Sequence, residues 1–247
     1  MDDSEAGLRR LLGRGRQLAR RLLARVVARG RDAGLLPYRP EHWTTEQWTT
    51  AYAGGQLDYY GSLAELGRYS ALVGYAGWYA ATTGRQLAVL DVGCGTGLLR
   101  QRLAGVPLSS YVGVDLSEAS IATATAAGHP RSEFRVGDIS TTAALGRFDL
   151  VVLNEVLYYA EDAPAFLEGL RGHLEPGGVV LVSMWRHPGD EALWRSVAAE
   201  FPIVDRVEVR NSGNPVNPLG WQVAMCGELG SGALGEGDEP EVTASSQ

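Results

Sequence analysis

The chain has 247 residues, with 22 basic and 29 acidic side chains, and a net charge of −7. This length suits one α/β domain with additions and allows a substantial buried core. Only two cysteines are present and no apolar run reaches about 18 residues, so neither a disulfide framework nor a membrane span is expected. We expect a cytoplasmic protein without a metal site.

Residues 1–36 are basic, in contrast to the acidic remainder. They carry nine arginines against four carboxylates, and their leucines and valines recur at three- and four-residue spacings. This pattern predicts a basic amphipathic helix, which could lie on an anionic membrane surface or dock on a partner. Packing on its own domain is slightly favoured, because Gly13 and Gly15 weaken the helix and aromatic anchors are missing. Nucleic-acid binding is disfavoured, since the remainder offers no basic groove.

Residues 37–85 are rich in Trp, Tyr and small side chains. Their aromatic residues precede a predicted helix from about Ser62 to Ala81. We interpret this region as a helical cap that precedes the first strand of the main domain.

The segment 87–99 reads LAVLDVGCGTGLL, which predicts a buried strand, a glycine-rich turn and a helix that begins near Leu98. Glycines at alternate positions let main-chain groups line a ligand directly. A P-loop is excluded because the chain has no lysine, and the glycine spacing weakens a dinucleotide site. In open α/β sheets a ligand binds at this edge, where the strand order reverses.

Five segments of the chain, taken in order, resemble the motifs of the class I S-adenosylmethionine-dependent methyltransferases. The first motif of that family is acidic-x-Gly-x-Gly-x-Gly, and the others follow here in family order. The five segments are DVGCGTG from Asp91, YVGVD over Tyr111 to Asp115, FRVGDI over Phe134 to Ile139, FDLVVL over Phe148 to Leu153, and LEPGGVVLVSM over Leu174 to Met184. Taken singly, Asp115 and Asp138 could instead be strand-end carboxylates or helix N-caps.

The resemblance implies S-adenosylmethionine as cofactor and assigns residues to it. Asp115 would accept hydrogen bonds from the ribose hydroxyls. Arg68 would bind the carboxylate of the methionine portion through its guanidinium, although it could also be a surface side chain paired with Glu65. The implied cofactor-binding residues are Arg68, Asp91, Gly93, Gly95, Gly97, Asp115, Leu116, Asp138, Ile139 and Asn154.

The expected fold is a Rossmann-like, seven-stranded, mostly parallel α/β sheet with helices on both faces and a helical N-terminal cap. Residues 86–226 would form the cofactor-binding domain. After the fifth strand we predict a helix near 190–200 and strands near 204–209 and 221–226, which complete the sheet with an antiparallel hairpin. Residues 227–247 are expected to form a disordered acidic tail, because large apolar side chains are almost absent.

Methyl transfer requires alignment and exclusion of water, and a hydroxyl acceptor also benefits from a general base. Residues that follow strands lie at the ligand edge, which favours Glu155 and His187 as catalytic candidates, together with Tyr158 near the acceptor. Tyr158 could instead pack under the cap. His129 and His173 precede strands and are expected at the opposite edge, and His42 cannot be placed.

The expected acceptor is a hydroxyl or amine of a small polar metabolite, such as an amino sugar or a glycosylated natural product. The cap resembles the nodulation-type N-methyltransferases that act on sugars. The sequence after the fourth strand lacks the Asn/Asp-Pro-Pro-aromatic pattern that is typical of nucleobase and glutamine methyltransferases. A methyltransferase of a membrane-borne quinone or lipid, and a non-catalytic cofactor-binding partner protein, remain alternatives. The oligomeric state is open.

Overall fold

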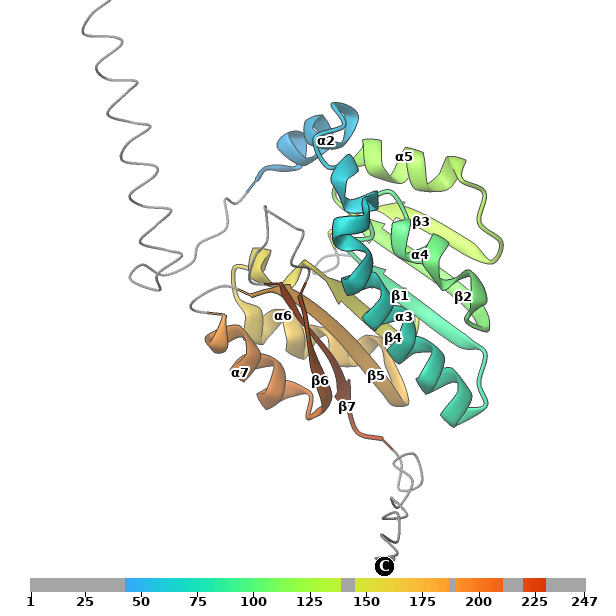
Figure 1. Cartoon of the computed structure of the whole chain (residues 1–247), viewed down its shortest axis with the longest axis vertical. Coiled ribbons are helices and arrows are strands. Elements are labelled where there is room, and N and C mark those ends of the chain that lie inside the picture. Colours follow the sequence, from blue (N-terminus) through green and yellow to red (C-terminus); the bar gives the residue numbers. More distant parts are fainter. Residues whose placement is uncertain (1–42, 139–144, 187–189, 211–219, 230–247) are drawn as a thin grey trace, which may run out of the picture.

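The structure is a computed structural model that describes residues 43–138, 145–186, 190–210 and 220–229. The predicted basic helix of residues 1–36, His42, Ile139, His187 and all of the predicted tail beyond residue 229 lie outside this range. Within it, a central sheet is flanked by helices on both faces (Figure 1). No described helix is both long enough and apolar enough to cross a bilayer.

Seven strands form one sheet in the order β3-β2-β1-β4-β5-β7-β6. All neighbours pair in parallel except β7, which is antiparallel to both β5 and β6. The predicted mostly parallel sheet with a terminal antiparallel hairpin is therefore confirmed. The strands are β1 (Leu87–Val92), β2 (Leu108–Asp115), β3 (Ser132–Val136), β4 (Phe148–Asn154), β5 (Leu174–Trp185), β6 (Ile203–Val209) and β7 (Trp221–Gly227).

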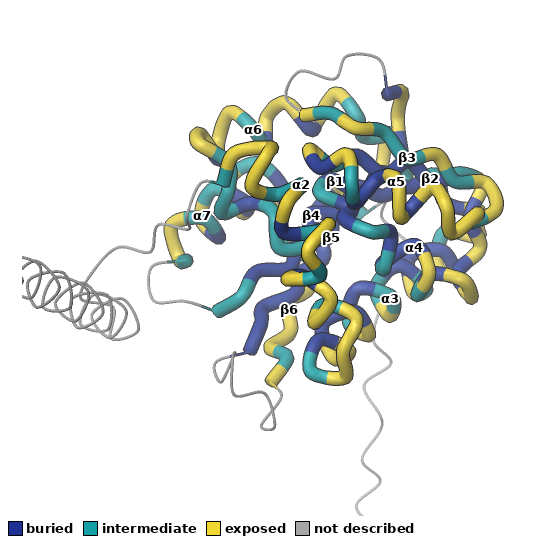
Figure 2. Tube along the Cα trace, turned by 90° about the horizontal axis from the view of Figure 1, so that it is seen from above, coloured by how far each residue is buried: buried dark blue, intermediate teal, exposed yellow. Residues whose placement is uncertain are grey.

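The central strands are apolar on both faces, and this explains why they read as continuous hydrophobic runs. Leu90, Val151 and Val180 are completely buried on one face of the sheet, and Val89 and Leu150 on the other. Figure 2 shows the strands buried at the centre and exposure concentrated on the surrounding helices and loops.

Helices cover both faces of the sheet. On one face α3 and α4 pack with β1, β2 and β7, and on the other α6 and α7 pack with β4 and β5. The α-helices are α2 (Thr45–Ala53), α3 (Leu63–Thr83), α4 (Leu98–Arg102), α5 (Glu118–Ala126), α6 (Ala163–Leu170) and α7 (Glu191–Glu200). Short 3-10 helices are η1 (Asp58–Gly61), η2 (Leu103–Gly105), η3 (Leu157–Tyr159) and η4 (Arg171–His173).

The predicted cap comprises α2, η1 and the beginning of α3. A capping box starts α2, in which the Thr44 hydroxyl accepts from the Gln47 N–H and the Gln47 side chain accepts from the Thr44 N–H. Gly84 ends α3 in the left-handed conformation, with φ of 66°. Beyond its first turns α3 packs on the sheet, so it serves both as part of the cap and as a covering helix of the domain.

Two of the motif segments extend past the regular part of a strand. The third strand ends at Val136, so Asp138 lies in the loop that follows it. The Pro-Gly-Gly segment falls within the bounds of β5, but Gly177 adopts φ of 77° there and the register with β4 shifts. The regular pairing of β5 with β4 therefore begins at Val179.

Candidate functional site

A cavity of about 990 Å³ opens at the carboxyl ends of the central strands. The strand order reverses between β1 and β4, and the loops that follow these two strands diverge to opposite faces. The cap, which precedes β1 in the chain, covers this opening. The lining includes Trp43, Trp48, Tyr52, Asp58, Tyr60, Arg68, Gly93, Gly95, Asp115, Leu116, Asp138, Asn154, Glu155, Tyr159, Glu161 and Asp162.

The glycine loop after β1 is held in a conformation that only glycine adopts readily. Gly93, Gly95 and Gly97 have φ of 69°, 53° and 80°. The N–H groups of Gly93 and Cys94 donate to the Val114 carbonyl, at 2.8 and 3.1 Å, which ties the loop to the end of β2. A Cβ on Gly93 would lie 2.4 Å from Val156 Cγ2. The loop therefore presents bare backbone to the cavity.

Asp115 ends β2 and is fixed by two main-chain donors. Its Oδ2 accepts from the Gly95 N–H and its Oδ1 from the Ser117 N–H, both at 2.9 Å. Burial raises the pKa of the Asp115 carboxyl, and these two hydrogen bonds oppose that rise. Each oxygen keeps a further lone pair, so the carboxylate can accept from two neighbouring hydroxyls, as the predicted ribose contact requires. Leu116 and Asp138 line the same end of the cavity.

Asp91 lies behind the glycine loop and is only 1% exposed. Its Oδ2 accepts a hydrogen bond from the Tyr111 hydroxyl, whereas Oδ1 is buried and has no partner among the described residues. Burial raises the pKa of this carboxyl to about 7, despite the bond from Tyr111. The predicted cofactor contact of Asp91 stays a prediction, and it would run through the unpartnered oxygen.

Arg68 projects from α3 into the cavity wall, where it is 1% exposed. Its Nη2 and Nε donate to Glu65 Oε2, at 2.9 and 3.3 Å, and its Nη1 donates to Asn154 Oδ1. The pair with Glu65 thus exists, but it is buried rather than on the surface. Burial alone would lower the pKa of the guanidinium, but neighbouring Glu155, Tyr69 and Glu65 raise it above its ordinary value, so Arg68 stays charged.

Glu155 follows β4 with φ of 63°, which is unusual for a residue with a side chain. Three donors hold its carboxylate. Oε2 accepts from the Tyr158 hydroxyl at 2.9 Å and from the Trp185 N–H at 3.2 Å, and Oε1 lies 2.9 Å from Ser183 Oγ. Ser183 Oγ also lies 2.9 Å from Asn154 Oδ1, so one network joins the Arg68 anchor to Glu155.

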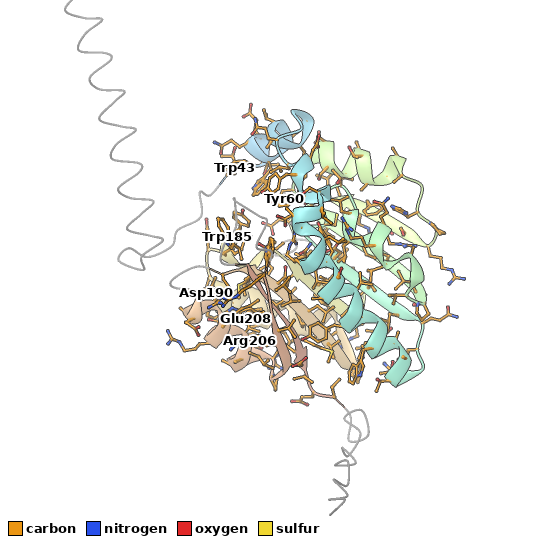
Figure 3. The ribbon with its side chains drawn as sticks, in the orientation of Figure 1. Trp43, Tyr60, Trp185, Asp190, Arg206 and Glu208 are labelled. Carbon is orange, nitrogen blue, oxygen red and sulfur yellow. The ribbon has the colours of Figure 1, made fainter. Side chains whose placement is uncertain are left out.

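Aromatic side chains connect the cap to the loop after β4. The Trp48 ring on α2 meets Tyr159 edge-on, with centroids 5.2 Å apart, and lies 4.7 Å from the Trp43 ring. A Cβ on Gly95 would come within 2.7 Å of the Tyr52 hydroxyl, so Tyr52 lies over the glycine loop. In Figure 3 Trp43 and Tyr60 both lie at the cap end of the molecule.

Sequence reasoning did not assign Tyr52 or Ser183 to the site. The four-residue spacing of Trp48 and Tyr52 places both on one helix face, and this spacing was a signal that Tyr52 could belong to the site. Tyr158, which was assigned, packs against the buried cluster and reaches the site through its hydroxyl bond to Glu155, whereas Tyr159 lines the cavity.

Two histidines, His129 and His173, belong to the described residues. His173, expected at the opposite edge of the sheet, lines the cavity at its extension along α6. Its Nδ1 lies 3.2 Å from the Gly146 carbonyl. Within the described ranges, no group of three or more His, Cys, Asp or Glu side chains is arranged to hold a metal ion.

Solved structures share this architecture. N-methyltransferase NodS from Bradyrhizobium japonicum, in complex with S-adenosyl-L-homocysteine, has a TM-score of 0.60 and 18% identity over 72% of this chain and 97% of its own. The 1,6-didemethyltoxoflavin-N1-methyltransferase of Burkholderia thailandensis, with 1,6-didemethyltoxoflavin and S-adenosylhomocysteine bound, has a TM-score of 0.60 and 20% identity, covering 75% of this chain and 87% of its own. These likenesses show the fold.

The family model that matches residues 90–182 is described as a methyltransferase domain. The chain therefore carries a methyltransferase domain at residues 90–182. Trans-aconitate 2-methyltransferase of Deinococcus radiodurans is 40% identical to it over 97 residues, which are 39% of this chain and 37% of that protein. A ubiquinone biosynthesis O-methyltransferase of Bradyrhizobium is 37% identical over 120 residues, 47% of each. The methyltransferase domain thus matches less than half of either relative.

The residues of the methyltransferase domain fit S-adenosylmethionine in three respects. The glycine loop forms a cradle that a Cβ would fill, and Asp115 keeps lone pairs for vicinal hydroxyls. The buried guanidinium of Arg68 keeps one N–H on each of Nη1 and Nη2 beside its bonds to Glu65 and Asn154, and such a pair suits a carboxylate. Sequence-predicted Gly93, Gly95, Asp115, Leu116, Asp138, Asn154 and Arg68 all line the one cavity, and Gly97 belongs to the same glycine loop.

Proposed function

We propose that this protein transfers a methyl group from S-adenosylmethionine to a hydroxyl or amine of a small polar metabolite, such as an amino sugar or a glycosylated natural product. The observation that carries the proposal is the continuity of the cavity. The glycine loop, Asp115, the aromatic side chains of the cap and Glu155 all line the same space. A cofactor and an acceptor can therefore meet inside one cavity.

When bound, the cofactor supplies a methyl group that its sulfonium already activates. The chain has to align the acceptor and exclude water. Asp115 and the glycine loop would hold the nucleoside, and Arg68 with Asn154 would orient the methionine portion. The rings of Trp48, Tyr52 and Tyr159 would cover the reacting atoms and remove water from them.

Glu155 and Tyr158 are proposed to act at the acceptor, and His187 is a further candidate beyond the described residues. Because Glu155 is already held by Tyr158, Ser183 and the Trp185 N–H, it would orient the acceptor through its remaining lone pairs. Asp91 and Ile139 are proposed to support cofactor binding.

The test is release of S-adenosylhomocysteine on incubation with S-adenosylmethionine and a panel of amino sugars, glycosylated metabolites and catechols. Glu155→Gln should slow turnover more than about tenfold and change cofactor affinity less, because Glu155 is linked to the Arg68 anchor only through Ser183 and Asn154. Glu168→Gln, at an exposed position on α6, is the matched control. Full activity of Glu155→Gln would remove its proposed role, and no release with any acceptor class would refute the reaction.

A membrane-borne quinone is the second candidate acceptor, because the relatives include ubiquinone biosynthesis O-methyltransferases. The basic segment 1–36 would then hold the protein at an anionic surface. Binding to anionic liposomes that is lost when residues 1–36 are deleted would favour this acceptor. If the full chain and the deletion variant bind the liposomes equally, or if neither binds them, a water-soluble acceptor is favoured.

A further inference from the structure

We propose that the acceptor is an amine carried by a ring-bearing molecule, and that the cavity discriminates against acceptors with a carboxylate or phosphate. This inference rests on the proposed methyl transfer and specifies the atom that receives the methyl group. It is carried by the charges at the cavity mouth, by the aromatic wall and by the hydrogen bonds of Glu155.

The lining of the cavity is strongly acidic. Among the described residues, its carboxyl side chains are Asp58, Asp115, Asp138, Glu155, Glu161 and Asp162. The same part of the chain contributes one arginine to the lining, Arg68, which is already bound to Glu65 and Asn154. A negatively charged acceptor would therefore meet several like charges, whereas a cationic amine would be attracted.

Four of these carboxyl groups surround the acceptor end rather than the cofactor end. Asp115 and Asp138 follow β2 and β3, where the nucleoside is expected. Asp58 begins η1 in the cap, and Glu161 and Asp162 lie between η3 and α6, where all three are exposed. Glu155 lies deeper, between the Arg68 anchor and the aromatic wall. An amine entering past the cap would thus meet carboxylates along its path.

The aromatic wall supplies flat, apolar surface beside these charges. Trp48 and Tyr159 join the cap to the loop after β4, and Tyr52 and Tyr60 add further rings to the lining. Such rings stack on flat ring systems and on the apolar face of sugars, and their faces attract cations. Aromatic rings together with carboxylates are a combination that suits an organic amine better than an anion.

The hydrogen bonds of Glu155 favour nitrogen over oxygen as the receiving atom. A hydroxyl acceptor has to lose a proton as it attacks, which requires a base. Glu155 already accepts from Tyr158, Ser183 and the Trp185 N–H, so these donors occupy most of the positions at which its carboxylate could take a proton from a hydroxyl. A neutral amine needs no such base, because its lone pair is free once a proton has been released to water.

The transfer to an amine is balanced without a further reactant. The nitrogen lone pair forms the N–C bond as the S–C bond breaks, so the positive charge moves from sulfur to nitrogen and a thioether remains. The product leaves as an ammonium ion. The Glu155 carboxylate, held in one place by its three donors, would stabilise the positive charge that forms on nitrogen during transfer.

The experiment measures binding to the full chain loaded with S-adenosylhomocysteine, by calorimetry. Two matched series are used, namely benzylamine, benzyl alcohol and benzoate, and glucosamine, glucose and glucuronate. In at least one series the amine should bind about tenfold more tightly than the carboxylate, with the alcohol between them, since each exposed charge contributes modestly. The series that binds shows whether the ring is aromatic or a sugar.

Equal or tighter binding of the carboxylate, or no binding of either amine, would overturn the inference. The double variant Asp58→Asn with Glu161→Gln should reduce amine affinity about threefold and leave S-adenosylhomocysteine affinity unchanged. Glu168→Gln is the control and should change neither. An amine preference that the double variant leaves undiminished contradicts the electrostatic explanation.

The two proposals fail in different ways. If S-adenosylhomocysteine does not bind to the wild-type chain, both the proposed function and this inference are refuted. If it binds and the alcohol is the preferred ligand in both series, methyl transfer stands and the amine inference is overturned.

Discussion

The two ends of the cavity are built in different ways. The cofactor end consists of main-chain groups and short loops that directly follow β1 and β2, such as the bond from the Gly95 N–H to Asp115. The proposed acceptor end consists of side chains from distant segments, as in the edge-on contact between Trp48 of α2 and Tyr159 after β4. The first end is therefore specified locally, whereas the second depends on how the cap folds over the sheet.

The largest effect is expected from removal of the Arg68 side chain, which joins α3 to Asn154 at the end of β4. Arg68→Met should lower the free energy of unfolding by about 3–5 kcal/mol, because the buried Glu65 carboxylate loses its partner. Urea denaturation measures the change. Arg85→Met removes a half-exposed pair with Asp149 and should cost about 1 kcal/mol or less.

Combining Arg68→Met with Glu65→Leu should recover most of the loss, because an apolar pair leaves no buried charge. If the two single arginine variants are destabilised equally, Arg68 does not anchor the cap.

The stability of the folded protein should depend on pH because of Asp91, which lies behind the glycine loop. Its pKa of about 7 lies above the ordinary 3.8, so between these values the folded protein binds more protons than the unfolded chain. The stability that Asp91 contributes is therefore present at low pH and is lost as pH rises toward 7.

The loss amounts to roughly 4 kcal/mol at most. Asp91→Asn cannot ionise, so its stability relative to the wild type should rise by that order between about pH 4 and pH 8. Denaturation curves of both proteins across this range provide the test. Parallel stability profiles would show that Asp91 is not a titrating buried carboxyl in this range.

A substitution in the glycine loop tests whether cofactor binding depends on main chain without side chains. Gly93→Ala should weaken S-adenosylhomocysteine binding by about a hundredfold, because its Cβ would meet Val156 at 2.4 Å and its φ is 69°. Gly77→Ala in α3, with open space around the added methyl, is the matched control and should bind normally. Normal binding by Gly93→Ala would show that the loop has room for a side chain.

The smallest effect is expected at Asp115. Asp115→Ala should weaken cofactor binding about thirtyfold, by removing an acceptor of the ribose hydroxyls and leaving the Gly95 and Ser117 N–H groups unpaired. Asp115→Asn keeps one acceptor oxygen, and its cofactor affinity should lie between those of Asp115→Ala and the wild type. Glu118→Gln, in the first turn of α5, serves as control. Calorimetry with S-adenosylhomocysteine compares the four proteins, and unchanged affinity in Asp115→Ala would remove the ribose contact.

The same contrast explains how far the sequence could be interpreted. The strands and the cavity edge followed from apolar runs and the glycine motif, whereas the seven-stranded sheet with its terminal hairpin followed from the family resemblance. The positions of Gly93 and Asp115 at the cavity were predictable because Gly93 follows β1 directly and Asp115 ends β2.

The acceptor end was not predictable in the same way. Sequence gives no sign that Trp48 meets Tyr159, or that Ser183 in the middle of β5 joins Asn154 to Glu155, because these contacts depend on tertiary packing. Likewise, Arg68 and Glu65 could be identified as a pair from their spacing, but their burial follows from the position of α3 against β7.

The central claim is that the cavity binds S-adenosylmethionine, and calorimetric titration of the full chain tests it most directly. Titrations with S-adenosylmethionine and with NAD are compared under the same conditions. The account predicts saturable binding of S-adenosylmethionine at one site, and no binding of NAD. Binding of NAD alone, or of neither compound, would contradict it.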